Sequence, residues 1–262
     1  MTVEDVWDPA QYDRFAAERR QPFGDLLDLV EAPGPGARVV DLGCGTGALT
    51  VALAERWDPA EVLGIDSSEA MLDEARRRTS AVVHFERGDL ARPPVEGLVD
   101  VIFANASLHW VPDHAAVLAC WRDLLTPGGQ VAVQVPANAD HPAHRLATEV
   151  AHDPQFSDAF GGAVPEDPVR RVLSPEAYAE LLDELGFGRQ HVRLQVYGHH
   201  LARTEDVVEW LQGTTLNRFR AALPPDVYAS FVDRFRSRLL HALGDGGPYF
   251  YAFKRILMWG RR

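Results

Sequence analysis

A glycine-rich turn that begins with an acidic residue is the segment of this chain best suited to chemistry. Residues 41–48 read Asp-Leu-Gly-Cys-Gly-Thr-Gly-Ala, at the end of one apolar run and at the start of a segment with a helical pattern. Because glycine has no side chain, Gly43, Gly45 and Gly47 would let a ligand approach the backbone closely. The pattern therefore predicts a small-molecule site where a strand meets a helix.

The acidic residue helps to identify the ligand. The glycine spacing also satisfies the G-x-G-x-x-A fingerprint of dinucleotide-binding proteins, so the glycines alone leave a nicotinamide or flavin cofactor open. A carboxylate at Asp41 would repel a pyrophosphate, whereas it can pair with a cationic amino-acid group. S-adenosylmethionine carries an ammonium group, a sulfonium group and no phosphate. Asp41 therefore favours S-adenosylmethionine as the cofactor.

Two further acids follow the next two apolar runs. Asp66 ends the second run, where a carboxylate can accept hydrogen bonds from both ribose hydroxyls, a feature shared by both cofactor classes. Asp89 follows the third run and is expected at the adenine amino group, with Leu90 against the ring. Each acid alone is equally typical of a loop or a helix cap. It is their joint placement with Asp41 that indicates a nucleoside site.

The elements that must position these residues alternate regularly along the chain. Five short runs rich in β-branched residues are separated by segments with helical periodicity, which predicts a parallel sheet with helices on both faces. The predicted strands are 37–42, 61–65, 82–85, 99–104 and 130–135, and the predicted helices between them are 46–57, 67–78 and 114–125.

The two ends of the chain depart from this alternation. Residues 9–30 predict a helix interrupted near Pro22, and beyond Pro136 the helical segments become longer and irregular. There we predict helices at 141–152, 175–185, 205–216 and 226–243, and strands at 192–196 and 249–259. We therefore divide the chain into an N-terminal helical cap (1–36), a Rossmann-like core (37–138), and a region with helical substrate-recognition insertions and the last two strands (139–262).

Composition excludes several classes of protein. The 262 residues, 46% hydrophobic and 24% charged, are typical of a globular protein with a sizeable core. No segment resembles a signal peptide or approaches the ~20 apolar residues that span a bilayer, so we expect a cytoplasmic protein without membrane contact. The net charge of −12 disfavours a nucleic-acid partner. Cys44 and Cys120 lack metal-ligand spacing, so we expect no metal.

The ordered set of motifs resembles class I S-adenosylmethionine-dependent methyltransferases. Residues 105–110 (Asn-Ala-Ser-Leu-His-Trp) follow the fourth predicted strand, and Pro-Gly-Gly at 127–129 precedes the fifth. In that class the loop after the fourth strand lies near the transferred methyl group. The resemblance therefore implies contacts from Asn105 and a reaction chamber lined by His109 or Trp110, although both are equally typical of packing. The predicted cofactor-binding residues are Asp41, Gly43, Gly45, Gly47, Asp66, Ser67, Met71, Asp89, Leu90 and Asn105.

The chain outside the cofactor region resembles trans-aconitate methyltransferases. This resemblance rests on residues 7–9 (Trp-Asp-Pro), 15–19 (Phe-Ala-Ala-Glu-Arg), 103–114 and 133–138, and it is weakest between about 150 and 190. It implies a protein with a seven-stranded, mostly parallel sheet that transfers a methyl group to a carboxylate of trans-aconitate. Because a carboxylate is already ionised at neutral pH, attack on a sulfonium methyl group needs no general base. Orientation and desolvation would carry the catalysis, so no catalytic residue is firmly assigned.

Holding a polycarboxylate requires a local basic pocket in an acidic protein. The family pattern has an arginine near Asn217, whereas this chain places Arg218 one position later. An arginine on a helix is more often solvated or paired at the surface than bound to a ligand. The candidate substrate-binding residues are Tyr12, Arg14, Arg19, His109, Trp110, His199, Arg218 and Arg255. The expected partner is a small carboxylic acid, bound by a monomer or homodimer.

Three other functions stay open at this point. One is a biosynthetic methyltransferase that acts on another oxygen, nitrogen or carbon, for which His109 would be the first candidate for a base. Another is a non-catalytic S-adenosylmethionine-binding regulator, although no DNA-binding helix pair or basic arm supports it. The last is an NAD-dependent oxidoreductase.

Overall fold

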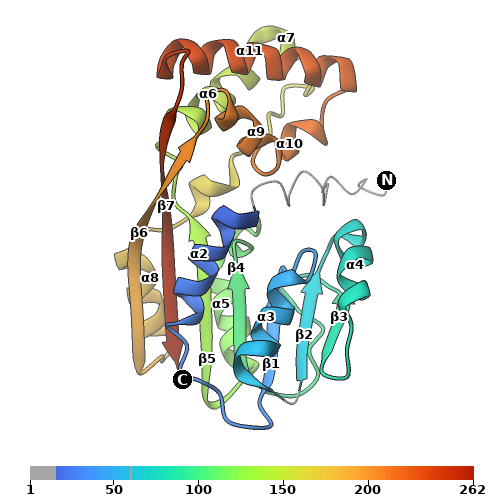
Figure 1. Cartoon of the computed structure of the whole chain (residues 1–262), viewed down its shortest axis with the longest axis vertical. Helices are drawn as coiled ribbons and strands as arrows, with labels where there is room; N and C mark the ends of the chain where they lie inside the picture. The colour runs from blue at the N-terminus through green and yellow to red at the C-terminus, as the bar shows by residue number, and fades with distance from the viewer. Residues whose placement is uncertain (1–15, 60) are drawn as a thin grey trace.

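The computed structural model describes the backbone of residues 16–59 and 61–262 and the side chains of 20–59 and 61–262 (Figure 1). Its centre is a seven-stranded sheet with the strand order β3-β2-β1-β4-β5-β7-β6. The strands are β1 (Arg38–Leu42), β2 (Glu61–Asp66), β3 (Val83–Arg87), β4 (Val99–Asn105), β5 (Leu125–Pro136), β6 (Arg189–Leu201) and β7 (Tyr249–Arg261).

The first five strands are parallel, and β7 runs antiparallel between β5 and β6. This confirms the predicted Rossmann-like fold class with its mostly parallel seven-stranded sheet. The chain builds outward from β1 in one direction through β2 and β3, and in the other through β4 and β5. The carboxyl ends of β1 and β4 therefore flank a topological switch point, where open α/β sheets bind their ligands.

Helices cover both faces of the sheet. One face carries α2 (Ala16–Leu27), α3 (Ala48–Trp57) and α4 (Glu69–Ala75), and the other carries α5 (His114–Asp123) and α8 (Pro175–Glu184). Neighbouring strand residues alternate between these two layers, since Val39 belongs to the first hydrophobic cluster and Val40 to the second. Both faces of the inner part of the parallel sheet are buried in this way, which explains why its inner strands read as nearly continuous apolar runs.

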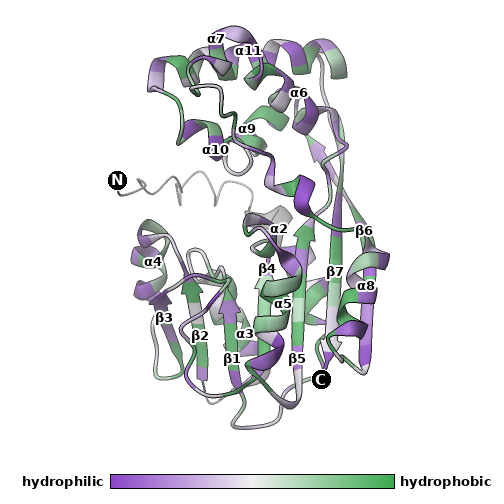
Figure 2. Ribbon diagram, turned by 180° about the vertical axis from the view of Figure 1, so that it is seen from behind, coloured by the Kyte–Doolittle hydropathy of each residue, from purple (hydrophilic) through white to green (hydrophobic). Residues whose placement is uncertain are grey.

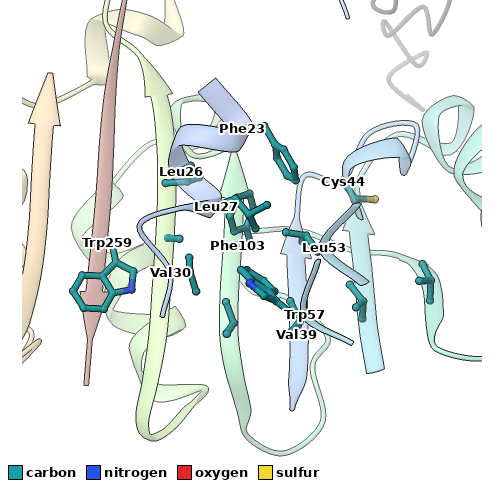
Figure 3. Close-up of a cluster of buried hydrophobic side chains, with 14 of the residues drawn as sticks. Phe23, Leu26, Leu27, Val30, Val39, Cys44, Leu53, Trp57, Phe103 and Trp259 are labelled. Atoms are coloured by element: carbon teal, nitrogen blue, oxygen red, sulfur yellow. The ribbon is translucent and has the colours of Figure 1, made fainter. Parts of the chain in front are cut away.

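The first hydrophobic cluster fixes α2 against the sheet beside the glycine turn. Phe103 of β4 packs edge-on against Phe23 of α2 and Trp57 of α3, with ring centroids 5.4 and 6.3 Å apart (Figure 3). Such aromatic pairs contribute about 0.5–1.5 kcal/mol beyond the area they bury. The described part of the N-terminal cap is therefore anchored to the core.

A separate layer of helices lies beyond the carboxyl ends of the parallel strands (Figure 1). It is formed by α6 (Pro142–Ala151), α7 (Pro154–Ser157), α9 (Asp206–Gln212), α10 (Asn217–Arg220) and α11 (Pro225–Leu243), which share a third hydrophobic cluster with the outer ends of β6 and β7. Hydrophobic and hydrophilic stretches alternate along α11, as expected for a helix that buries one side (Figure 2). This helical layer covers the switch point.

The predicted interruption at Pro22 is wrong, because α2 runs through the proline from Ala16 to Leu27. A proline inside a helix costs about 3 kcal/mol through its missing N–H and its steric clash. The next turn buries Phe23, Leu26 and Leu27 against the sheet. Burial of each large apolar side chain contributes about 1.5–3 kcal/mol, which outweighs the cost of the proline.

Several other boundaries also differ from the sequence predictions. The strand predicted at 130–135 begins at Leu125, which pairs with Val99 of β4, and extends to Pro136. The strand predicted at 192–196 extends over Arg189–Leu201, because its whole length pairs with β7. The helix predicted at 205–216 ends at Gln212, where Gly213 and two threonines follow, and α10 forms separately. The helix predicted at 67–78 consists of α4 and a 3₁₀ turn over Arg76–Arg78. In the described parts of the chain, no helix is long and apolar enough to cross a membrane.

Candidate active site

The glycine turn between β1 and α3 is held by hydrogen bonds to the end of β2. The amides of Gly43 and Cys44 donate to the carbonyl of Ile65, at 2.7 and 3.1 Å. The amide of Gly45 donates to Asp66 Oδ2 at 2.8 Å, and the amide of Ser68 donates to the other oxygen, Oδ1, at 2.9 Å. The Asp66 carboxylate thus joins the glycine turn to the start of α4.

Gly43 lies too close to the next loop to carry a side chain. Its φ is +79°, and a Cβ at this position would lie 2.3 Å from Ser107 Cβ. Gly45 has a φ of +56° but nothing within 4 Å of its would-be Cβ. Both glycines therefore have a left-handed backbone, but an added side chain would clash with a neighbouring residue only at Gly43.

This difference yields a prediction about stability. Gly43→Ala should lower the free energy of unfolding by about 1–3 kcal/mol more than Gly45→Ala, because only the first variant adds an overpacking cost to the backbone strain. Urea unfolding of the two cofactor-free variants measures this difference. Equal unfolding free energies would show that the close contact with Ser107 does not constrain the turn.

Three cavities open at the carboxyl ends of β1, β2 and β4. The α3 groove is lined by residues that include Phe23, Asp41, Gly43, Thr46 and Leu49. The glycine-loop cavity is lined by residues that include Gly43, Gly45, Asp66, Ser67, Met71 and Leu90. The upper cavity, below the helical layer, is lined by residues that include His109, His144, Trp210, Phe253 and Arg255.

The three cavities meet at the end of β4. Asn105 lines all three of them, and Ala106 and Trp110 line both the glycine-loop cavity and the upper cavity. Asn105 Oδ1 is buried and accepts no hydrogen bond from the residues that the structure describes. A molecule in the glycine-loop cavity and another in the upper cavity would therefore approach each other across Asn105 and Ala106.

The backbone at this junction is strained. Ala106 has a φ of +57°, a conformation that costs a non-glycine residue about 1–2 kcal/mol and that often marks functional sites. Two hydrogen bonds hold it in place: its amide donates to the carbonyl of Gln134 at 2.9 Å, and Ser107 Oγ donates to the carbonyl of Leu42 at 2.6 Å. These contacts fix the loop after β4 between β1 and β5.

Asp41 supplies a buried acid beside the glycine turn. Its side chain is 3% exposed and accepts a hydrogen bond from Thr50 Oγ1 at 2.7 Å. Burial raises the pKa of Asp41 to about 7, against the lowering effect of the Thr50 hydrogen bond and with a further increase from the charge of Asp66. No cationic side chain pairs with it in the described part of the chain. A cationic ligand would therefore stabilise the ionised form.

Most of the predicted cofactor residues line these cavities, but two do not. Gly47 is the N-cap of α3, and its missing side chain leaves room for the ring of Phe85, which would lie 2.6 Å from a Cβ. Asp89 is exposed, and its Oδ1 accepts a hydrogen bond from the Ala91 amide at 2.9 Å. The cavity-lining residues among those predicted are Asp41, Gly43, Gly45, Asp66, Ser67, Met71, Leu90 and Asn105.

The wall of the upper cavity includes a buried arginine, Arg255. The Arg255 side chain donates from Nη1 to Gln134 Oε1 at 3.0 Å, and its guanidinium lies 4.7 Å from the centroid of the Phe253 ring. His109 is 5% exposed, and its Nδ1 has no hydrogen-bond partner in the described residues. Burial, with smaller contributions from the nearby charges of His114 and Arg255, lowers the pKa of His109 to about 3. The imidazole is therefore neutral near pH 7.

The low pKa of His109 predicts a specific pH dependence of stability. The unfolded chain binds a proton at this histidine below about pH 6.5, whereas the folded protein does not, so stability falls as the pH falls from 6.5 towards 3. Between about pH 7.5 and about pH 5 this group should cost about 2 kcal/mol of unfolding free energy. Urea unfolding should show that His109→Asn loses about 2 kcal/mol less unfolding free energy than the wild-type protein over the same pH interval. An unchanged pH dependence in the variant would contradict the burial of a neutral His109.

The other predicted substrate residues lie outside the upper cavity or outside the described residues. The Arg218 guanidinium lies 3.0 Å from Asp167 Oδ1 and donates to Thr148 Oγ1 at 3.2 Å. Its charge is therefore paired with an acid inside the protein. His199 is buried, with its ring centroid 5.0 Å from that of Trp210. Tyr12, Arg14 and the side chain of Arg19 lie outside the described residues.

Sequence reasoning missed His144, which lines the upper cavity from α6. Its Nδ1 lies 2.9 Å from Asp167 Oδ2, and the same carboxylate pairs with Arg218. The sequence correctly predicts a helix over this histidine, but no periodic pattern links it to an acid in the irregular segment between α7 and α8. In the described residues, no three His, Cys, Asp or Glu side chains are grouped as a metal site.

Comparison with known proteins identifies the family. A methyltransferase domain model matches residues 39–129. The trans-aconitate 2-methyltransferases of Deinococcus radiodurans and Methylobacterium nodulans are 42% and 40% identical to this chain, and each alignment covers 98% of both proteins. Among solved structures, a phosphoethanolamine N-methyltransferase of Haemonchus contortus in complex with S-adenosylhomocysteine matches with a TM-score of 0.55 at 17% identity, over 92% of this chain and 52% of that one.

The fold, the glycine turn and these matches define the chain as a Rossmann-like methyltransferase, so the oxidoreductase interpretation is dropped. It belongs to the trans-aconitate 2-methyltransferase family. The predicted enzyme class and family are thereby confirmed.

Proposed function

We propose that this protein transfers the methyl group of S-adenosylmethionine to a carboxylate of trans-aconitate, which yields a monomethyl ester and S-adenosylhomocysteine. The observation that carries this proposal is the junction at Asn105 and Ala106, where the glycine-loop cavity meets a cavity with a buried arginine, Arg255. The names of the 42% and 40% identical relatives support the choice of acceptor.

The residues around the glycine turn suit this cofactor. Asp41 is a buried acid without a cationic partner in the described residues, which fits the ammonium group of the amino-acid moiety. Asp66 lines the glycine-loop cavity where a carboxylate can accept hydrogen bonds from ribose, and Met71 and Leu90 provide apolar contacts for adenine. When bound, the cofactor supplies an electrophilic methyl group on its sulfonium.

The protein's own residues would act by position and charge. Arg255 can pair with a carboxylate of the acceptor, and Gln134 holds its guanidinium by accepting one hydrogen bond. His109 remains neutral in the working pH range and adds no positive charge that would repel a sulfonium. Since an ionised carboxylate needs no base, these residues would contribute orientation and exclusion of water rather than proton transfer.

A panel of acceptors tests the proposal. Release of S-adenosylhomocysteine should be measured with trans-aconitate, cis-aconitate, isocitrate and citrate, and we expect the highest kcat/KM for trans-aconitate. Cofactor binding without turnover of any of these acids would contradict the proposed acceptor and favour a different acceptor or a regulatory role. A cytoplasmic location and a monomeric or homodimeric state stay predictions, and size-exclusion chromatography would test the second.

A further inference from the structure

A second basic side chain enters the upper cavity from the element opposite the sheet. His144 lies on α6 in the helical layer, whereas Arg255 lies on β7, and both line the same cavity. We propose that His144 is a specificity-determining residue, which binds a carboxylate of the acceptor other than the one that is methylated. This inference rests on the proposed function and names the group that would select tricarboxylates over dicarboxylates.

The surroundings of His144 leave one ring nitrogen for a ligand. The side chain is 3% exposed, and its Nδ1 lies 2.9 Å from Asp167 Oδ2. Nε2 is buried and has no hydrogen-bond partner in the part of the chain that the structure describes. Buried polar atoms in folded proteins are nearly always paired, so an unpaired nitrogen in a cavity wall indicates a ligand atom.

The acid behind His144 is itself held in place. Asp167 accepts a hydrogen bond from the Val169 amide at 3.1 Å, and Arg218 Nη1 lies 3.0 Å from the same oxygen, Oδ1. Burial would raise the pKa of Asp167, but the hydrogen bond with His144 and the charge of Arg218 bring it below its ordinary value. An ionised Asp167 accepts the Nδ1 proton of His144 and fixes the ring orientation.

The charges in this network favour an anionic ligand. Arg218 and Asp167 neutralise each other, so an imidazolium at His144, with protons on both Nδ1 and Nε2, would give the network one positive charge. Its Nε2–H would donate to a carboxylate, in a hydrogen bond that is stronger than one between neutral groups. Trans-aconitate has three carboxylates. If one reacts at the Asn105 junction, the other two need partners, and the upper cavity offers two, Arg255 and His144.

The test compares acids that differ by one carboxylate. His144→Asn keeps a donor near the position of Nδ1 for Asp167 but removes the atom equivalent to Nε2. The acids are trans-aconitate and its three analogues that each lack one carboxylate: mesaconate, itaconate and glutaconate. For His144→Asn we expect kcat/KM for trans-aconitate to fall about 10- to 100-fold, mainly through a higher KM. The analogue that lacks the carboxylate bound by His144 should keep its wild-type kcat/KM.

Three further variants separate binding from structure. His144→Gln places an amide donor near the position of Nε2 and should recover part of the preference for trans-aconitate. His152→Asn is the matched control, because His152 is exposed at the C-terminal end of the same helix and should leave every rate unchanged. Asp167→Asn changes the group that orients His144, so it should raise the KM of trans-aconitate with little effect on kcat.

The possible outcomes distinguish this inference from the proposed function. A uniform loss of kcat/KM for all four acids in His144→Asn, or no loss for any, would overturn the role of His144 while the wild-type turnover stands. Absence of turnover by the wild-type protein would instead overturn the proposed function. Affinity for S-adenosylhomocysteine should be the same in wild type and His144→Asn, and a large decrease would count against a role confined to the acceptor.

Discussion

Asp41→Asn is expected to weaken S-adenosylhomocysteine binding about 10- to 100-fold while it stabilises the cofactor-free protein. The loss of affinity follows from the removal of a charge-assisted interaction between a buried carboxylate and the ammonium group, worth about 1.5–3 kcal/mol. The gain in stability follows from the pKa of Asp41, which burial raises to about 7, so folding opposes ionisation of this acid at neutral pH. Asparagine avoids that cost, which is about 4 kcal/mol at pH 7. Thr50 keeps an oxygen to which it can donate.

Binding measurements at several pH values test the contribution of the Asp41 carboxylate to cofactor affinity. A cation prefers the ionised carboxylate, so wild-type affinity should fall about tenfold for each pH unit below about 7, and binding near neutral pH should release a proton. The variant should show neither effect. Calorimetry in buffers of different ionisation enthalpy measures the released proton directly. Equal affinity and equal proton release in wild type and variant would contradict the assignment of Asp41 to the ammonium group.

Arg255→Met is expected to lower kcat/KM for trans-aconitate by at least about 30-fold, because removal of one partner from a buried charge pair costs about 2–5 kcal/mol. The arginine is 4% exposed and lies in the wall of the upper cavity. Methionine preserves much of the apolar stem, so the strand should still pair with β5. Steady-state kinetics with trans-aconitate measure the loss, and affinity for S-adenosylhomocysteine should change less than about threefold, since the cofactor residues are untouched.

Lys254→Met is the matched control for this experiment. Lys254 is the neighbouring residue on β7, and its amine lies 2.6 Å from both carboxylate oxygens of Asp140 at the surface. Loss of a surface ion pair costs at most about 1 kcal/mol, so its kcat/KM should stay close to the wild-type value. Similar losses in both variants would show that the upper cavity is not the acceptor site.

The parallel half of the fold could be predicted because its signals are local. The strands β1, β2, β4 and β5 are apolar runs largely buried on both faces, and glycines or helix caps mark the turns between them. The edge strand β6 shows the limit of this reasoning. Its outer side is exposed, as Leu194 and Val196 illustrate, so its length is set by backbone pairing with β7 and not by its own hydrophobic pattern.

The candidate site likewise has a part that the sequence predicts and a part that only the structure shows. The glycine turn and Asp66 were predictable because their spacing reflects a local backbone geometry that a ligand requires. His144, Asp167 and Arg218 come together from α6, the segment before the 3₁₀ turn Pro168–Arg171, and α10. Only the packing of the helical layer brings these elements together, and no periodicity in the sequence encodes it. The sequence named Arg218 for its charge, but only the structure shows the acid that this charge holds.

Mass spectrometry of trans-aconitate incubated with the protein and methyl-deuterated S-adenosylmethionine shows whether a carboxylate of the acid receives the methyl group. We expect one deuterated methyl group on the acid, attached as an ester that mild base hydrolyses, with one S-adenosylhomocysteine formed for each ester. An unlabelled acid in the presence of a protein that binds the cofactor, or a label that base does not release, would contradict carboxylate methylation at the Asn105 junction.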